Sequence, residues 1–164
     1  MSTKRLSDGC SKSLSKVNSY RKKTGDKKEN YIAIQLAKFK VKFNESGKKV
    51  RVFISELPGM KFGGYDIDFH LPDKKIFMEV TSSISDGKLA KLALQSKGIK
   101  QSFPDNKFVT FILQQPRSAS CFINNIKSCP YVDDVVVIWK DEWKYVTELK
   151  QLICDRLKPV LVEK

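Results

Sequence analysis

The chain contains two stretches of alternating apolar residues, 65–71 and 76–81, separated by a short turn-forming segment. Alternation with a period of two predicts β-strands, and the Pro and Asp between the stretches favour a turn. We therefore predict a β-hairpin with its turn at residues 72–75, in which Leu71 pairs with Ile76. The register is tightly constrained, because a slip of one residue would move every apolar side chain to the opposite face.

The other face of this hairpin carries acidic side chains. Position numbers across an antiparallel ladder sum to a constant, so Asp68 is predicted to face Glu79 and Asp66 to face Thr81. Directly opposed side chains have Cβ atoms about 4.5–5.5 Å apart. Two carboxylates at that separation repel at neutral pH unless they share a proton or bind a cation. We favour the cation, so the hairpin predicts a metal site.

The net charge of the chain favours an anionic partner. Thirty-one Lys and Arg against 18 Asp and Glu give a formal charge of +13 over 164 residues. Such a charge attracts polyanions, either nucleic acid or an acidic membrane. No run approaches the roughly 18 apolar residues of a membrane span, and the N-terminus lacks the apolar core of a signal peptide. We therefore expect a soluble intracellular protein, cytoplasmic or nuclear, with no membrane partner.

The sequence divides into a basic arm and a folded domain. Residues 1–28 carry nine Lys or Arg and two Asp with few apolar residues, which is typical of a flexible segment. This arm is either a solvated tail or an electrostatic arm that adds phosphate contacts. Residues 29–164 are predicted to form one domain. The lysines expected to contact nucleic acid are Lys22, Lys23, Lys27, Lys28, Lys61 and Lys97.

Periodicity predicts an alternation of helices and strands along the rest of the chain. The predicted elements are a helix from Glu29, a strand at 49–55, the hairpin, a helix after Thr81, a strand at 108–113, a short helix after Pro116, a strand at 134–139 and a closing helix that stops before Pro159. We expect an α/β fold, a three-layer α/β/α sandwich with a central mixed sheet. Glu29 lies on the apolar face of its helix, where it either complements the helix dipole or points inward.

With these elements in place, the chain resembles the PD-(D/E)XK, or restriction-endonuclease-like, nuclease superfamily. The resemblance covers residues 29 to about 113. It rests on Glu29 in the first helix, on Gly64-Tyr65-Asp66-Ile67-Asp68 and on Phe77-Met78-Glu79-Val80-Thr81, an arrangement similar to Holliday-junction-resolvase-like members. It implies an αβββαβ core with an Asp on the second core strand and Glu-x-Lys on the third.

The resemblance implies a role for each acid. Asp68 would be the metal-bridging aspartate and Glu79 the second metal ligand, with the backbone carbonyl of Val80 also available and Asp66 as the alternative ligand. Glu29 would be the first-helix glutamate that holds a second ion or a metal-bound water. The cofactor implied is Mg²⁺ or Mn²⁺.

The lysine of the family motif is replaced by Thr81 in this chain. Some members of the superfamily place the lysine on the next helix, where Lys88 and Lys91 lie along one stripe of this sequence. We take Lys91 as the first candidate and Lys88 as the second, the alternative for each being a solvated surface lysine. The literal Pro72-Asp73 dipeptide is rejected as the family's "PD" because it lies in the turn, off the acidic face.

The resemblance implies a metal-dependent DNA endonuclease that hydrolyses phosphodiester bonds, with structure-selective cleavage ahead of site-specific cleavage. The bound metal would activate water for attack at phosphorus. Members commonly act as homodimers, so a homodimer is also implied. One alternative is an RNA endonuclease of the Glu-x-Thr type. Another is a non-catalytic nucleic-acid-binding module, which Thr81 favours and the retention of Glu29, Asp68 and Glu79 disfavours, because buried acids cost stability.

Overall fold

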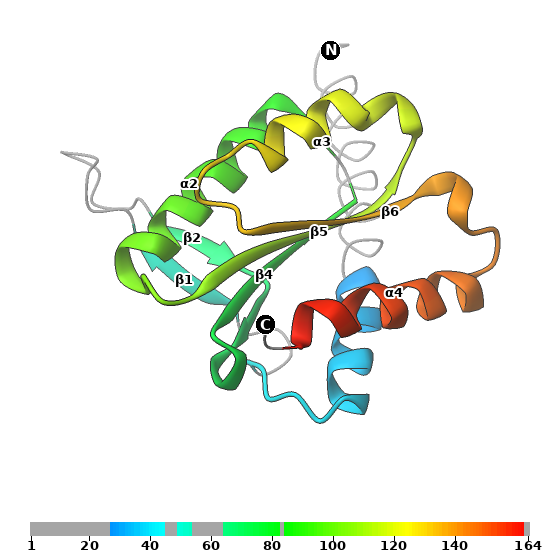
Figure 1. Ribbon diagram of the computed structural model, residues 1–164, viewed down its shortest axis with the longest axis horizontal. Coiled ribbons are helices and arrows are strands. Elements are labelled where there is room, and N and C mark those ends of the chain that lie inside the picture. The colour runs from blue at the N-terminus through cyan, green and yellow to red at the C-terminus, as the bar shows by residue number, and fades with distance from the viewer. Residues whose placement is uncertain (1–26, 45–48, 54–63, 83, 163–164) are drawn as a thin grey trace, which may run out of the picture.

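Helices lie on both faces of a mixed β-sheet in the computed structural model of the protein (Figure 1). The structure describes residues 27–44, 49–53, 64–82 and 84–162. This α/β arrangement is compatible with the sandwich that the sequence predicts, because each face of the sheet is covered by a layer of helices.

Within the described residues, the main sheet has four strands in the order β3-β4-β5-β6. They are β3 (Phe69–Leu71), β4 (Ile76–Thr81), β5 (Lys107–Gln115) and β6 (Asp134–Trp139). β3 runs antiparallel to β4, whereas β4, β5 and β6 run parallel to one another. The predicted mixed sheet, with the hairpin as its antiparallel pair, is confirmed.

The turn of the hairpin forms where the sequence places it. Leu71 pairs with Ile76, and the intervening residues form a short 3-10 helix, η1 (Pro72–Lys74). Lys75 completes the turn in the left-handed region at φ 54° and donates its N–H to the carbonyl of Pro72. Positive φ is uncommon outside glycine, so this turn hydrogen bond and the strand pairing beside it hold Lys75 in place.

The predicted first strand of the hairpin is in fact two strands. The chain bends at Asp68, and the residues before the bend form β2 (Gly64–Ile67). β2 pairs antiparallel with β1 (Val50–Phe53) in a separate two-stranded sheet. The predicted pairing of Asp66 with Thr81 is therefore wrong, because the partner strand changes at the bend.

Helices flank the main sheet. They are the helical residues 27–38, α2 (Asp86–Ser102), α3 (Ser120–Lys127) and α4 (Val146–Leu161), with short 3-10 helices η2 (Arg117–Ala119) and η3 (Lys140–Glu142). In Figure 1, α2 and α3 lie on one side of the sheet, and α4 and the blue N-terminal helix lie on the other. No helix in the described part of the chain is long and apolar enough to cross a membrane.

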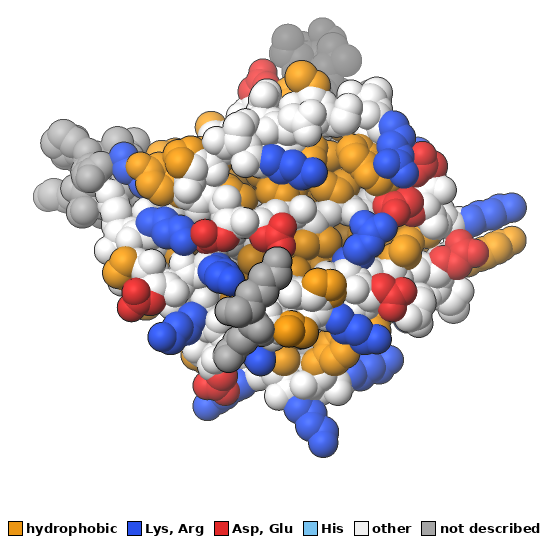
Figure 2. All heavy atoms as spheres, in the orientation of Figure 1, with side chains coloured by type: hydrophobic (Ala, Val, Ile, Leu, Met, Phe, Trp, Pro, Cys, Tyr) orange, Lys and Arg blue, Asp and Glu red, His pale blue; other side chains and the backbone are white. Residues whose placement is uncertain are grey.

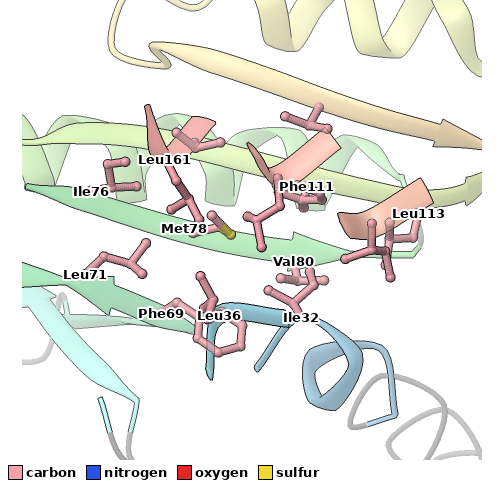
Figure 3. Close-up of a cluster of buried hydrophobic side chains, with 14 of the residues drawn as sticks. Ile32, Leu36, Phe69, Leu71, Ile76, Met78, Val80, Phe111, Leu113 and Leu161 are labelled. Atoms are coloured by element: carbon pink, nitrogen blue, oxygen red, sulfur yellow. The ribbon is translucent and has the colours of Figure 1, made fainter. Parts of the chain in front are cut away.

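Each face of the main sheet has its own hydrophobic core. One core, drawn in Figure 3, joins helix 27–38 and α4 to the sheet and includes Met78 and Leu161. The other core lies under α2 and α3 and includes Phe77. Because successive residues of a strand point to opposite faces, β4 supplies side chains to both cores. Glu79 shares the face of Phe77 and so points toward α2.

Side chains cap part of the backbone of β6, which forms one edge of the main sheet. Arg156 Nη1 donates to the carbonyl of Val137 at 2.7 Å, and the N–H of Trp139 donates to Glu142 Oε2 at 2.7 Å. Arg156 and Glu142 form an ion pair at 2.5 Å. An uncovered strand edge is a template for pairing with another chain, so this ion pair protects the end of β6.

Helix α4 continues past the point where the sequence predicts its end. Pro159 is expected to stop the helix, because proline lacks an N–H and crowds the preceding turn. The prediction is wrong, since the helix extends to Leu161 with Pro159 exposed inside its last turn. Leu161 is buried in the core beside helix 27–38. Packing of this last turn therefore outweighs the hydrogen bond that proline removes.

The start of the folded domain differs slightly from the predicted boundary. Residues 27 and 28, which the sequence assigns to the arm, are already helical. Lys28 is buried and therefore belongs to the folded domain. Residues 1–26 lie outside the described residues, so the basic arm itself stays a prediction.

Candidate functional site

Asp68 and Glu79 are buried side by side at the bend between the two sheets. The backbone N–H of Asp68 donates to Glu79 Oε2 at 3.2 Å. The N–H of Val80 donates to Asp68 Oδ2 at 2.9 Å. Each carboxylate is thus oriented by the backbone of the other's strand, and the register of the hairpin brings the two acids together as predicted.

Helix α2 supplies two ammonium groups to Glu79. Lys88 Nζ lies 3.1 Å and Lys91 Nζ lies 3.7 Å from Glu79 Oε1. The helix begins at this point because the hydroxyl of Ser85 accepts the N–H of Lys88 at 3.2 Å and caps the first turn. Both predicted lysines therefore reach the site, and Lys88, the second choice from sequence, is the closer one.

A third lysine approaches from the opposite side. Lys49 immediately precedes β1, and its Nζ lies 2.5 Å from Asp68 Oδ1 and 3.5 Å from Glu29 Oε1. Glu29, in the helix 27–38, therefore points toward Asp68 and Lys49 rather than only complementing the helix dipole. We call the six residues the acid–lysine cluster: Glu29, Lys49, Asp68, Glu79, Lys88 and Lys91.

Burial makes the side chains of Glu29 and Glu79 reluctant to ionise. Desolvation, reinforced by the charge of Asp68, raises the pKa of Glu79 against the opposing effect of the two α2 lysines. The same causes raise the pKa of Glu29 to about 7. Burial alone would lower the pKa of Lys49, but its hydrogen bond to Asp68 and the nearby carboxylates outweigh burial and raise it. Glu29 and Glu79 therefore bind their protons more tightly than ordinary glutamates do.

The formal charges of the cluster balance, because three carboxylates face three ammonium groups. Asp68 and Glu79 supply hard oxygen donors, and Mg²⁺ is commonly held by one or two carboxylates together with water and substrate phosphate. Among the described residues, no group of three or more His, Cys, Asp or Glu can hold a metal ion. The two carboxylates of Asp68 and Glu79 fit the oxygen donors that Mg²⁺ or Mn²⁺ takes.

Comparison with known proteins identifies no relative. No family model, curated protein or solved structure matches the chain.

Asp66, the alternative metal ligand, does not join the cluster. Its exposed carboxylate pairs with Arg51 at 3.1 Å on the neighbouring strand. Its backbone carbonyl accepts a hydrogen bond from the side-chain amide of Gln95 at 2.9 Å, which ties β2 to α2.

Thr81, at the position of the family lysine, is buried at the end of β4. Val80 contacts Asp68 through its N–H.

The lysines proposed to bind nucleic acid have different surroundings. Lys27 is exposed, whereas Lys28 is buried and donates to Gln114 Oε1 at 2.5 Å. The Lys28 ammonium is therefore engaged inside the fold, which argues against it as a surface contact. Lys97 is partly buried on α2 and has an interaction partner. The remaining candidates, which lie outside the described residues, are Lys22, Lys23 and Lys61.

The chain's single histidine, His70, packs at the edge of a core. Its ring stacks on Phe77 with the centroids 4.1 Å apart, and the ring of Phe103 lies 6.1 Å away. Burial lowers the pKa of His70. We therefore assign this imidazole a packing role and not that of a general base.

Sequence reasoning missed Lys49, although a signal for it exists. Residues Lys49 and Arg51 form the polar face of the predicted strand at 49–55. In the structure, Val50 pairs with Ile67, so the same antiparallel register places Lys49 opposite Asp68. Pairing the basic face of the strand at 49–55 with the acidic face of the following strand therefore predicts Lys49 at the site.

Proposed function

We propose that this protein is a divalent-metal-dependent nuclease that hydrolyses phosphodiester bonds in DNA. The observation that carries the proposal is the pairing of two buried carboxylates, Asp68 and Glu79, with three lysines around them. Buried acids lower the stability of the fold unless they have partners. Carboxylates can hold a divalent metal and neighbouring ammonium groups can bind a phosphate, so this arrangement suits a site that binds both ligands.

The order of elements supports a restriction-endonuclease-like core. A helix at 27–38, β1, the bent strand β2–β3, β4, α2 and β5 follow one another as in an αβββαβ core. The two acids lie at the bend after β2 and on β4, and Glu29 lies in the first helix. This placement agrees with the roles that the resemblance implies.

Each residue of the cluster has a defined task under this proposal. Asp68 and Glu79 would hold Mg²⁺ or Mn²⁺, which when bound lowers the pKa of water and neutralises charge at phosphorus. Lys88 and Lys91 would contact the phosphate, the task that Thr81 cannot perform because it carries no charge. Lys88 takes priority over Lys91, since its Nζ is closer to Glu79.

The surface suits a backbone-binding protein more than one that reads bases. On the face shown in Figure 2, Lys and Arg side chains are spread over the surface among Asp and Glu side chains. The net charge of +13 supplies phosphate attraction, which positions a nucleic acid without reading its sequence. We therefore favour structure-selective over site-specific cleavage, and a homodimer would allow both strands to be cut.

A non-catalytic nucleic-acid-binding module is the second candidate. The balance of charge within the acid–lysine cluster favours it, because the lysines alone already neutralise the acids. The buried Thr81 in place of the family lysine favours it as well. Cleavage of RNA in place of DNA would instead indicate an RNA endonuclease of the Glu-x-Thr type.

The test is cleavage by the wild type and by Glu79→Gln. Labelled duplex DNA, four-way junctions, single-stranded DNA and RNA would be incubated with Mg²⁺ or Mn²⁺. Loss of one metal ligand is expected to slow cutting by at least about 100-fold, since a bound metal supplies several kcal/mol of transition-state stabilisation. Asp73→Asn is the matched control, because it removes a carboxylate from the exposed turn η1. Salt-sensitive binding without cutting by the wild type would establish the binding module.

A further inference from the structure

The carboxylate oxygens of Asp68 and Glu79 are divided between two kinds of partner. One oxygen of each acid accepts a backbone N–H, from Val80 to Asp68 Oδ2 and from Asp68 to Glu79 Oε2. The other oxygen of each faces lysine, with Lys49 at Asp68 Oδ1 and two α2 lysines at Glu79 Oε1. The backbone therefore fixes one oxygen of each acid, while flexible side chains hold the other.

The lysines differ from the acids in their access to solvent. The side chains of Asp68 and Glu79 are 2% and 3% exposed. Those of Lys49 and Lys91 are 44% and 41% exposed, and that of Lys88 is 19% exposed. A lysine ammonium is a compact charge on a flexible four-carbon stem, so it can leave a carboxylate and stay near the same site.

A divalent cation held by Asp68 and Glu79 would compete with the lysines for Asp68 Oδ1 and Glu79 Oε1, the two oxygens that no backbone N–H holds. Its double positive charge would also repel the ammonium groups at a separation of a few ångströms, where screening by salt is weak. The displaced ammonium groups would then lie at the rim of the metal site without a carboxylate partner. A backbone phosphate is the anion that suits this position, because lysine binds phosphate as a point charge.

We propose that Lys49, Lys88 and Lys91 exchange partners: they hold the carboxylates in the metal-free chain and hold phosphates once the metal binds. Metal and nucleic acid would then bind cooperatively, each strengthening the other. This inference rests on the proposed function and adds a coupling between its two ligands. It also gives Lys49, immediately before β1, the same role as the α2 lysines on the opposite side of the site.

Thermodynamic linkage makes the proposal measurable. If nucleic acid tightens metal binding by some factor, the metal must tighten nucleic-acid binding by the same factor. In the wild type we expect a factor of about 10, within the usual range for coupled sites. Removing a lysine that competes for the carboxylates should tighten metal binding in the absence of nucleic acid and reduce the coupling factor.

The experiment measures Mn²⁺ binding by calorimetry, with and without a phosphorothioate duplex that resists hydrolysis. Lys49→Met and Lys88→Met are expected to bind Mn²⁺ alone about 3- to 10-fold more tightly and to lose most of the coupling. Lys127→Met removes the same charge from an exposed site on α3 and should behave as the wild type. Thermal unfolding would verify that each variant is folded before its affinity is compared.

Direct contact between the metal and a phosphate would also couple the two ligands. In that case the coupling factor would be the same in Lys49→Met and Lys88→Met as in the wild type, so an unchanged coupling factor overturns the exchange of partners. If the wild type cuts nucleic acid but the two ligands bind independently, the inference fails and the proposed function stands. If the wild type binds no Mn²⁺ and cuts nothing, both fail.

Discussion

Replacing Glu29 with glutamine should stabilise the metal-free protein at high pH and leave its stability at low pH almost unchanged. Burial and the charge of Asp68 raise the pKa of Glu29 from 4.5 to about 7. A carboxyl that binds its proton more tightly in the folded chain makes folding less favourable as it ionises. Its contribution to stability is therefore present below the ordinary pKa of 4.5 and is lost as the pH rises toward 7.

The magnitude follows from the size of the shift. A change from 4.5 to about 7, at about 1.36 kcal/mol for each pKa unit, gives an upper limit of about 3.4 kcal/mol. The Glu29 side chain is 28% exposed, and solvent screening reduces the effect to about 1–2 kcal/mol. For a chain of this length, that difference corresponds to roughly 2–8 °C in the melting temperature.

Urea unfolding in the presence of EDTA, at about pH 4 and about pH 8, measures this difference. Glu29→Gln is expected to gain about 1–2 kcal/mol over the wild type at the higher pH only. Asp73→Asn removes a carboxylate from the exposed turn η1 and serves as the control for net charge. An equal effect of Glu29→Gln at both pH values would refute the account of Glu29 as a desolvated acid beside Asp68.

Two further substitutions test how the fold supports the site and the sheet. Ser85→Ala removes the cap that accepts the N–H of Lys88 and should lower the free energy of unfolding by about 1 kcal/mol, with Ser85→Asp restoring it in the same denaturant titration. Glu142→Gln weakens the ion pair with Arg156 and the cap on the N–H of Trp139, so light scattering on heating should show earlier aggregation than in the wild type. Unchanged scattering would contradict the protective role of this pair at the edge of β6.

The sequence predicts best those features that depend on local pattern. The alternation that ends at Leu71 and resumes at Ile76 sets the hairpin register, and that register brings Asp68 and Glu79 together. The strand at 134–139 also has the predicted bounds, because its apolar run stands alone between polar segments.

Features that depend on long-range packing were less predictable. Apolar and polar residues alternate without a break through Asp68, although the chain passes from one sheet to the other there. A period of two shows which face of a strand a side chain occupies, and it does not show which strand is the partner. The local geometry of Pro159 predicts that α4 ends before it, whereas the burial of Leu161 decides where the helix ends. Lys49 was overlooked because its partners, Glu29 and Asp68, are brought to it only by the fold.

The bend at Asp68 divides the acid–lysine cluster between two sheets. Lys49 immediately precedes β1 of the two-stranded sheet, whereas Glu79 lies within the four-stranded one. A ligand that contacts residues next to both sheets will therefore stabilise the docked arrangement of the sheets, because it binds only the conformations in which they are docked. Its binding should slow amide hydrogen exchange throughout β1 and β2, far beyond the residues it touches, because local opening of that small sheet would break the site.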